Sequence, residues 1–141
     1  MLNLSSNKIS KLEGLAHLKN LVFLDVSDNK IEEFDPDSEL PKGLQIVRMN
    51  DNPVEQNDKK YREKLIVALD DLVELDRLQV IQAERLLYKG LLPKHLHPQV
   101  NNRLKQLRKE KMEQEAREKL EFEVQAEMME DKGISQNTRI K

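Results

Sequence analysis

The chain has 141 residues, 22 of them leucine, with no cysteine or tryptophan and a formal net charge of −2. The absence of cysteine excludes disulfides and Cys-ligated metal sites and favours an intracellular location. No apolar run approaches the ~18 residues of a membrane span, and the first residues do not resemble a signal peptide, so we expect neither. Residues 1–80 hold 11 Lys/Arg and 16 Asp/Glu, against 13 and 10 in residues 81–141. This shift indicates an acidic, leucine-rich unit followed by a charged extension.

One pattern occurs three times within residues 1–57. Its copies are Leu2-x-Leu4-x-x-Asn7-x-Ile9, Leu24-x-Val26-x-x-Asn29-x-Ile31 and Val47-x-Met49-x-x-Asn52-x-Val54. Alternating apolar residues predict a short strand with one buried face. The asparagine stands where the chain must turn, and its amide can bond backbone groups that the turn leaves unpaired. Such a repeat buries its apolar residues against the next copy.

The pattern resembles the leucine-rich-repeat family, in the short intracellular subclass with a period near 22 residues. The resemblance implies about two and a half repeats over residues 1–57 and a C-terminal cap over residues 58–80. The cap resemblance rests on Asn52-Pro53, Tyr61-Arg62 and Leu75-Asp76, with Leu65, Leu69 and Leu72 between them. Tyr61 is expected to pack on the last coil. The fold class is α/β: a truncated solenoid of short parallel strands, a helical cap and a long charged α-helix.

The N-terminal end shows no corresponding cap. The residue equivalent to Leu21 would precede Met1, so the chain is expected to begin inside a strand. We expect one of two explanations: earlier repeats of the solenoid are missing from this chain, or a partner protein covers this open end.

Residues that alternate with the core positions are expected to line the concave face of the solenoid. They are Asn3, Ser5, Phe23, Asp25, Ser27, Ile46, Arg48 and Asn50. An apolar column beside a polar one suits a partner helix or loop, with Phe23 as the main anchor. The alternative is that the polar members are only solvated and that Phe23 leans on a neighbour.

Residues 81–98 are expected to form a helix and a linker, and residues 99–132 a long charged helix. The long helix contains neither Gly nor Pro and is expected to end at Gly133, before a flexible tail over residues 133–141. Its basic first part supplies a second candidate partner-binding set: Arg103, Lys105, Leu107, Arg108, Lys109 and Lys111. This segment suits packing along a large partner with an acidic surface, such as tubulin. A solvated single helix remains the alternative, and nucleic acid is the weakest one, since no aromatic residues are interleaved and the chain is acidic overall.

The sequence offers no catalytic constellation, no phosphate-binding glycine loop and no metal cluster, so we expect no enzyme, cofactor or metal. The resemblance implies a protein–protein interaction scaffold. The leading hypothesis is a structural subunit of a ciliary axoneme or another microtubule-associated assembly in the cytoplasm, with axonemal proteins among its partners. The alternative is a regulatory adaptor, such as a phosphatase or nuclear-complex subunit, that uses the concave face alone.

Overall fold

The computed structural model describes residues 1–129 with their side chains and continues the backbone of the last helix to Ile140. The expected tail over residues 133–141 lies outside the fully described residues. The chain divides into two compact units, Met1–Leu104 and Lys105–Lys141. The first unit contains the repeats, the cap and the start of the long helix.

The first unit is built on one five-stranded sheet. Its strands are β1 (Leu2–Asn3), β2 (Phe23–Asp25), β3 (Ile46–Arg48), β4 (Glu74–Leu75) and β5 (Leu78–Gln79), in that spatial order. Strands β1 to β4 are parallel, and β5 returns antiparallel to β4. Leu24 aligns with Leu2 and with Val47, so the register reproduces the sequence repeat. The predicted short parallel strands are confirmed.

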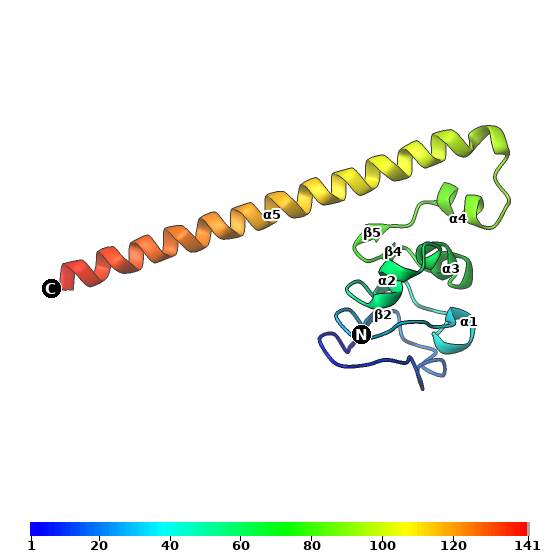
Figure 1. Cartoon of the computed structure of the whole chain (residues 1–141), viewed down its shortest axis with the longest axis horizontal. Coiled ribbons are helices and arrows are strands. Elements are labelled where there is room, and N and C mark those ends of the chain that lie inside the picture. The colour runs from blue at the N-terminus through cyan, green and yellow to red at the C-terminus, as the bar shows by residue number, and fades with distance from the viewer. Residues whose placement is uncertain (141) are drawn as a thin grey trace. The chain divides into compact units, whose positions relative to one another are not determined.

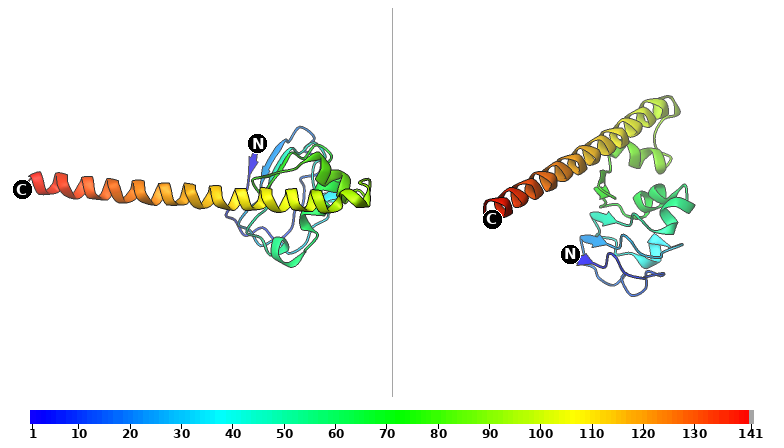
Figure 2. Two further views of the ribbon diagram at one scale, coloured as in Figure 1. Left: turned by 90° about the horizontal axis from the view of Figure 1, so that it is seen from above. Right: turned by 60° about the vertical axis from the view of Figure 1, so that its left-hand side comes forward.

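Short helices lie on the side of the first unit opposite the strands, as the turned view in Figure 2 shows for α1 and α3. The short helices of this unit are α1 (Pro36–Glu39), α2 (Pro53–Asn57), α3 (Tyr61–Ala68) and α4 (Gln82–Tyr88), labelled in Figure 1, in which α2 overlaps the strands. A 3-10 turn, Lys94–Leu96, precedes the long helix α5 (His97–Ile140). Pro36 occupies the first turn of α1, and Asp35 accepts a hydrogen bond from the Asp37 amide, which defines where this helix begins.

The core fills the space between the strands and the opposite side of each coil. Leu24, Val47 and Leu75 occupy equivalent strand positions and are at most 1% exposed. Leu65 and Ile66 of α3 are fully buried on the far side of the last coil. Each strand therefore buries its apolar residues against its neighbours, as the repeat predicted. In the first coil Leu2, Leu4, Ile9 and Leu18 are only partly buried, whereas Leu12 and Leu15 are at most 9% exposed.

A column of asparagine side chains joins successive coils. Asn29 donates from Nδ2 to the carbonyls of Val26 (2.9 Å) and Leu4 (3.0 Å), which lie in two different coils. Its Oδ1 accepts from the amide of Ile9 at 3.1 Å. Asn29 is only 3% exposed, so water cannot reach these backbone groups to take over the hydrogen bonds that the side chain makes.

Asn52 repeats this arrangement one coil further on. It donates to the carbonyls of Met49 (2.9 Å) and Val26 (3.0 Å) and accepts from the amide of Ile31 (3.2 Å). The side chain is 2% exposed. Each asparagine thus closes its own turn and fixes the preceding coil.

Asp76 continues the column into the cap. One carboxylate oxygen accepts from the amide of Met49 at 2.6 Å, and the other accepts from the Tyr61 hydroxyl at 2.6 Å. Burial, together with the neighbouring Asp76 carboxylate, raises the pKa of Tyr61, so the phenol remains a hydrogen-bond donor. The Tyr61 ring meets the Phe34 ring of the second repeat edge to face, with centroids 6.3 Å apart.

Two arginines fasten α4 to the cap. Arg62 pairs with Glu84, with Nε 2.7 Å from Oε2, and the Glu84 side chain is completely buried. Arg85 donates to the carbonyls of Ile66 (2.6 Å), Leu69 (3.0 Å) and Leu72 (2.7 Å). The first two of these carbonyls belong to the last turn and the C-cap of α3, which a helix leaves without intrahelical partners.

We expect Asn52→Ala to lower the free energy of unfolding by about 3 kcal/mol, because the substitution leaves buried backbone groups in two coils unpaired. Asn7→Ala is the matched control. Asn7 bonds only its own turn, at Leu4 and Ser5, and is exposed, so the expected loss is below about 1 kcal/mol. Urea denaturation followed by circular dichroism measures both. Equal losses in the two variants would contradict the role of Asn52 as a link between coils.

Candidate functional site on the concave sheet face

The eight residues expected on the concave face belong to β1, β2 and β3 or directly follow these strands. The parallel register sets Phe23 beside Ile46, and Asp25 between Asn3 and Arg48. Phe23, Ile46 and Arg48 are half-buried, since each lies on the sheet surface between neighbouring strands. The sheet thus places an aromatic, an aliphatic and a cationic side chain on adjacent strands.

The polar members of this face bond to each other. Asp25 accepts from both the amide (3.0 Å) and the hydroxyl (2.6 Å) of Ser27, and Asp25 is only 8% exposed. Asn3 accepts from the amide (3.0 Å) and the hydroxyl (2.7 Å) of Ser5 in the same way. These pairs shape the strand ends, and an acceptor that already receives two hydrogen bonds has less to offer a partner.

Arg48 lies next to the aromatic residue of this face. Its guanidinium carbon is 5.1 Å from the centroid of the Phe23 ring, within the range of a cation–π interaction. Its Nε is buried and finds no hydrogen-bond acceptor among the described residues. Because this Nε is enclosed by the protein itself, a partner carbonyl or carboxylate would meet the rest of the half-buried guanidinium instead.

The second predicted set of partner-binding residues lies on the long helix α5 and not on the sheet. Arg103, Lys105, Arg108 and Lys109 are exposed, Lys111 is half-buried, and Leu107 is buried. Lys109 and Lys111 approach Glu113 (4.0 Å) and Glu115 (3.8 Å) one turn further along the helix. Such exposed pairs contribute little to stability, and their cations remain accessible. The basic side chains therefore surround the helix and form no pocket.

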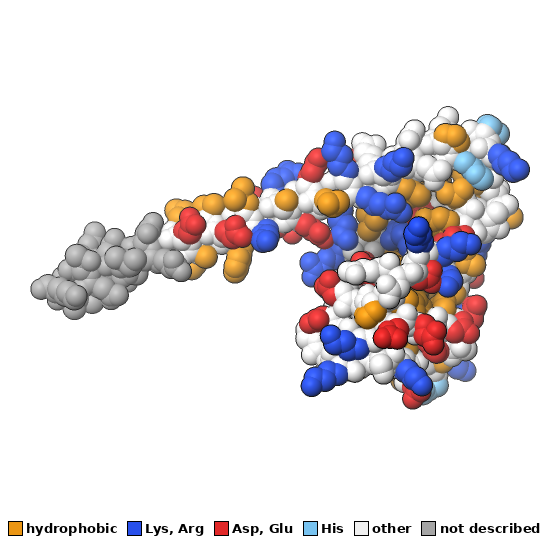
Figure 3. Space-filling view, in the orientation of Figure 1, with side chains coloured by type: hydrophobic (Ala, Val, Ile, Leu, Met, Phe, Trp, Pro, Cys, Tyr) orange, Lys and Arg blue, Asp and Glu red, His pale blue; other side chains and the backbone are white. Residues whose placement is uncertain are grey.

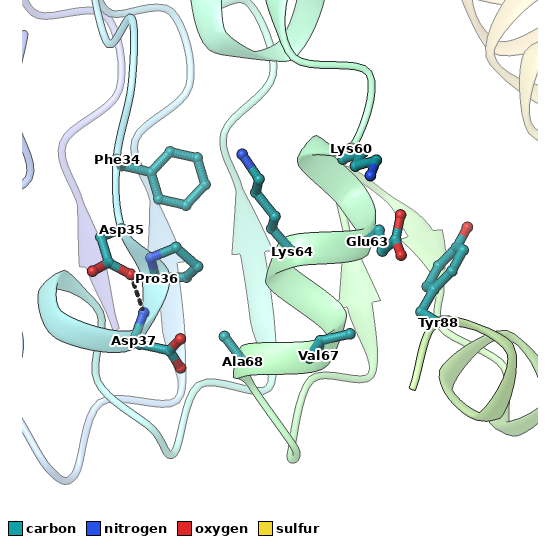
Figure 4. Close-up of a pocket in the computed structure, with 10 residues that line it drawn as sticks. All are labelled: Phe34, Asp35, Pro36, Asp37, Lys60, Glu63, Lys64, Val67, Ala68 and Tyr88. Carbon is teal, nitrogen blue, oxygen red and sulfur yellow. Dashed lines mark hydrogen bonds between the residues drawn. The ribbon is translucent and has the colours of Figure 1, made fainter. Parts of the chain in front are cut away.

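A groove of about 470 Å³ lies on the other side of the first unit (Figure 4). Phe34 and Pro36 line one wall, and the α3 residues Val67 and Ala68 line the other. Most of its charged groups already have partners: Asp35 caps α1, Asp37 pairs with Lys42, and Lys64 pairs with Asp58. Lys60 and Glu63 also line the groove.

No group of three or more potential metal ligands is found among the described residues. Over the same residues, no helix combines the length and apolar character that crossing a bilayer requires.

Sequence reasoning missed the groups that hold the cap. Glu84 lies in a predicted helical segment, yet its complete burial beside Arg62 cannot be read from apolar spacing. Arg85 stands at an apolar spacing and instead satisfies the carbonyls of α3 and its C-cap. The pairs Tyr61-Arg62 and Leu75-Asp76 were the available signal, since they marked the cap without indicating which side chains meet.

Parallel strands stacked one coil at a time, with buried asparagines linking the coils, define a repeat solenoid. The family model for leucine rich repeats (2 copies) matches residues 1–42. Residues 1–42 therefore match leucine-rich repeats, and a helical C-terminal region follows the solenoid.

Ten chains of solved structures match the fold. One belongs to the crystal structure of the Drosophila melanogaster SNF/U2A' complex, at 20% identity and a TM-score of 0.43, covering 71% of this chain and 72% of that one. The comparison with curated proteins yields no match.

Proposed function

We propose that the protein is a non-enzymatic scaffold that binds a partner protein on the concave sheet face, as an intracellular structural subunit of a ciliary axoneme or another microtubule-associated assembly. The observation that carries the proposal is the group formed by Phe23, Ile46 and Arg48 on two adjacent strands. Aromatic residues and arginine dominate interface energetics, and a regular sheet holds them rigidly.

The chemistry of this group suggests what the partner presents. Phe23 and Ile46 offer apolar area, and the half-buried guanidinium of Arg48 favours a carbonyl or carboxylate beside its cation. A partner helix or loop that carries an apolar side chain next to a hydrogen-bond acceptor matches both the apolar surface and the cation. Asp25 and Ser27 act mainly by fixing the C-terminal end of β2, where Asp25 aligns with Arg48 of β3.

The basic start of α5 supports the assignment to a microtubule-associated assembly. Five Lys/Arg lie between Arg103 and Lys111 against one Glu. A helix with this charge is attracted to an acidic surface such as that of tubulin. The adaptor function is the second candidate, because the concave face needs no contribution from α5.

The variant Phe23→Ala/Arg48→Ala tests the concave face. Removing an aromatic anchor and its neighbouring cation should weaken partner binding at least about 10-fold, since each anchor of this kind contributes more than about 1 kcal/mol. Quantitative co-purification from ciliated and non-ciliated cells measures the loss. Val67→Ala/Lys60→Ala, on α3 and in the α2–α3 turn, is the matched control and should keep the partners. If both variants recover the same proteins in equal amounts, the concave face is not the binding site.

The variant Arg108→Glu/Lys111→Glu separates the two candidate functions. It reverses two of the five positive charges between Arg103 and Lys111. If the protein lies on microtubules, the wild type should pellet with polymerised tubulin, and the variant should pellet several-fold less at low salt. Gln106→Glu, a smaller change of charge in the same helical segment, is the control. A wild type that never pellets, while the concave variant still loses its partners, would exclude the microtubule assignment and leave the adaptor.

A further inference from the structure

The second unit exposes apolar side chains along α5. Met112 is 70% exposed and Leu120 is 59% exposed, with the exposed Ala116 midway between them at intervals of four residues. Figure 3 shows such hydrophobic side chains spaced along the helix among charged ones. Within the described residues of this unit the apolar face is uncovered, and an uncovered face on a long helix indicates an interaction surface.

Charged residues extend this face in both directions. Positions spaced four and three residues apart fall on one side of a helix. From the basic segment onward these positions are Lys105, Lys109, Met112, Ala116, Leu120, Glu123 and Glu127. The face therefore begins with two lysines, has a small apolar centre, and turns acidic at Glu123 and the adjacent Glu127.

We propose that this face pairs with the same face of a second copy of the chain, antiparallel, with the two-fold axis at Ala116. In this register each residue faces the one equally far from Ala116 on the other side. Lys105 then faces Glu127, Lys109 faces Glu123, and Glu113 faces Lys119. Met112 faces Leu120, and the two copies of Ala116 meet at the axis, where their small side chains allow the helices to approach closely.

The charge pattern selects this register over the nearest alternatives. On the side of the helix centred on Ala116 it opposes three pairs of unlike charge, 105/127, 109/123 and 113/119, and no pair of like charge. Moving the axis one turn to Met112 sets Lys105 against Lys119. Moving it one turn to Leu120 sets Glu113 against Glu127. A parallel, in-register pair opposes every charged residue to its own copy, which is repulsive throughout.

The same residues predict a weak, salt-sensitive association. The apolar centre is small, and the flanking ion pairs lie near the solvent, where salt screens them. The ion pair between Lys109 and Glu113 within one helix is 4.0 Å long and exposed, so exchanging it for Glu123 of the second copy loses little. The dimer would carry two concave faces, and two linked sites raise the avidity for a repetitive partner.

Cysteine cross-linking tests the orientation directly, because the chain contains no cysteine of its own. We expect Ala116→Cys to give a disulfide-linked dimer on mild oxidation of the full chain. Lys105→Cys alone should remain largely unlinked, whereas a mixture of Lys105→Cys and Glu127→Cys should cross-link. Efficient self-linking of Lys105→Cys would indicate a parallel pair and would overturn the proposal. Self-linking of Leu120→Cys in preference to Ala116→Cys would overturn the register.

Sedimentation equilibrium at low and high salt tests the ion pairs. Lys119→Glu sets Glu113 against a second glutamate on both sides of the axis and should weaken dimerisation about tenfold. Glu113→Lys/Lys119→Glu restores unlike pairs with the signs exchanged and should return the dissociation constant to within about threefold of the wild type. A wild type that is monomeric at every concentration, or a double variant as weak as the single one, would contradict the proposal.

Discussion

Each turn of a narrow solenoid leaves backbone groups that the short strands cannot pair, and the rest of this structure depends on how those groups are satisfied. Asn29 and Asn52 do so from inside the core, each bonding carbonyls in two coils and accepting an amide from the coil before. A hydrogen bond in such a dry environment is strong, and its loss is correspondingly costly. The spacing of the coils, and with it the register of the sheet, follows from these side chains.

In the cap, Asp76 takes the place of the asparagine and forms hydrogen bonds to two different elements. Asp76 accepts the Met49 amide of the last repeat and the hydroxyl of Tyr61, so one carboxylate links the final coil to α3. Arg62 and Glu84 then fix α4 through a buried ion pair. Desolvation offsets much of the attraction in such a pair, but removing either partner would leave the other charge buried and unpaired. The cap therefore combines an apolar core, with Leu65 and Leu69 fully buried, with the same kind of directed polar contacts that join the repeats.

The sequence predicts the repeating part of the fold well, because position and burial recur with a fixed period. Leu24 and Val47 are buried and aligned as that period requires, and Asn29 and Asn52 occupy the predicted turns. The period does not extend to Glu84 or Arg85, whose partners come from other elements. On the concave face, the pattern indicated the positions of Asp25 and Ser27 but not their mutual hydrogen bonds. A contact that occurs only once, between side chains of two different elements, leaves no periodic signal in the sequence and therefore cannot be predicted from the repeat.

The proposed binding group on the sheet depends on the asparagine column. The asparagine column holds β2 and β3 at a fixed register, and that register brings Arg48 over Phe23 to form the proposed binding group. The most direct test is native-state hydrogen exchange at the amide of Ile31, which donates to Asn52 across the coil boundary. If the column holds the coils together, this amide should exchange only through global unfolding, with an opening free energy equal to that from denaturation. Exchange at the rate of an exposed turn amide would show that the coils separate freely and would contradict the account.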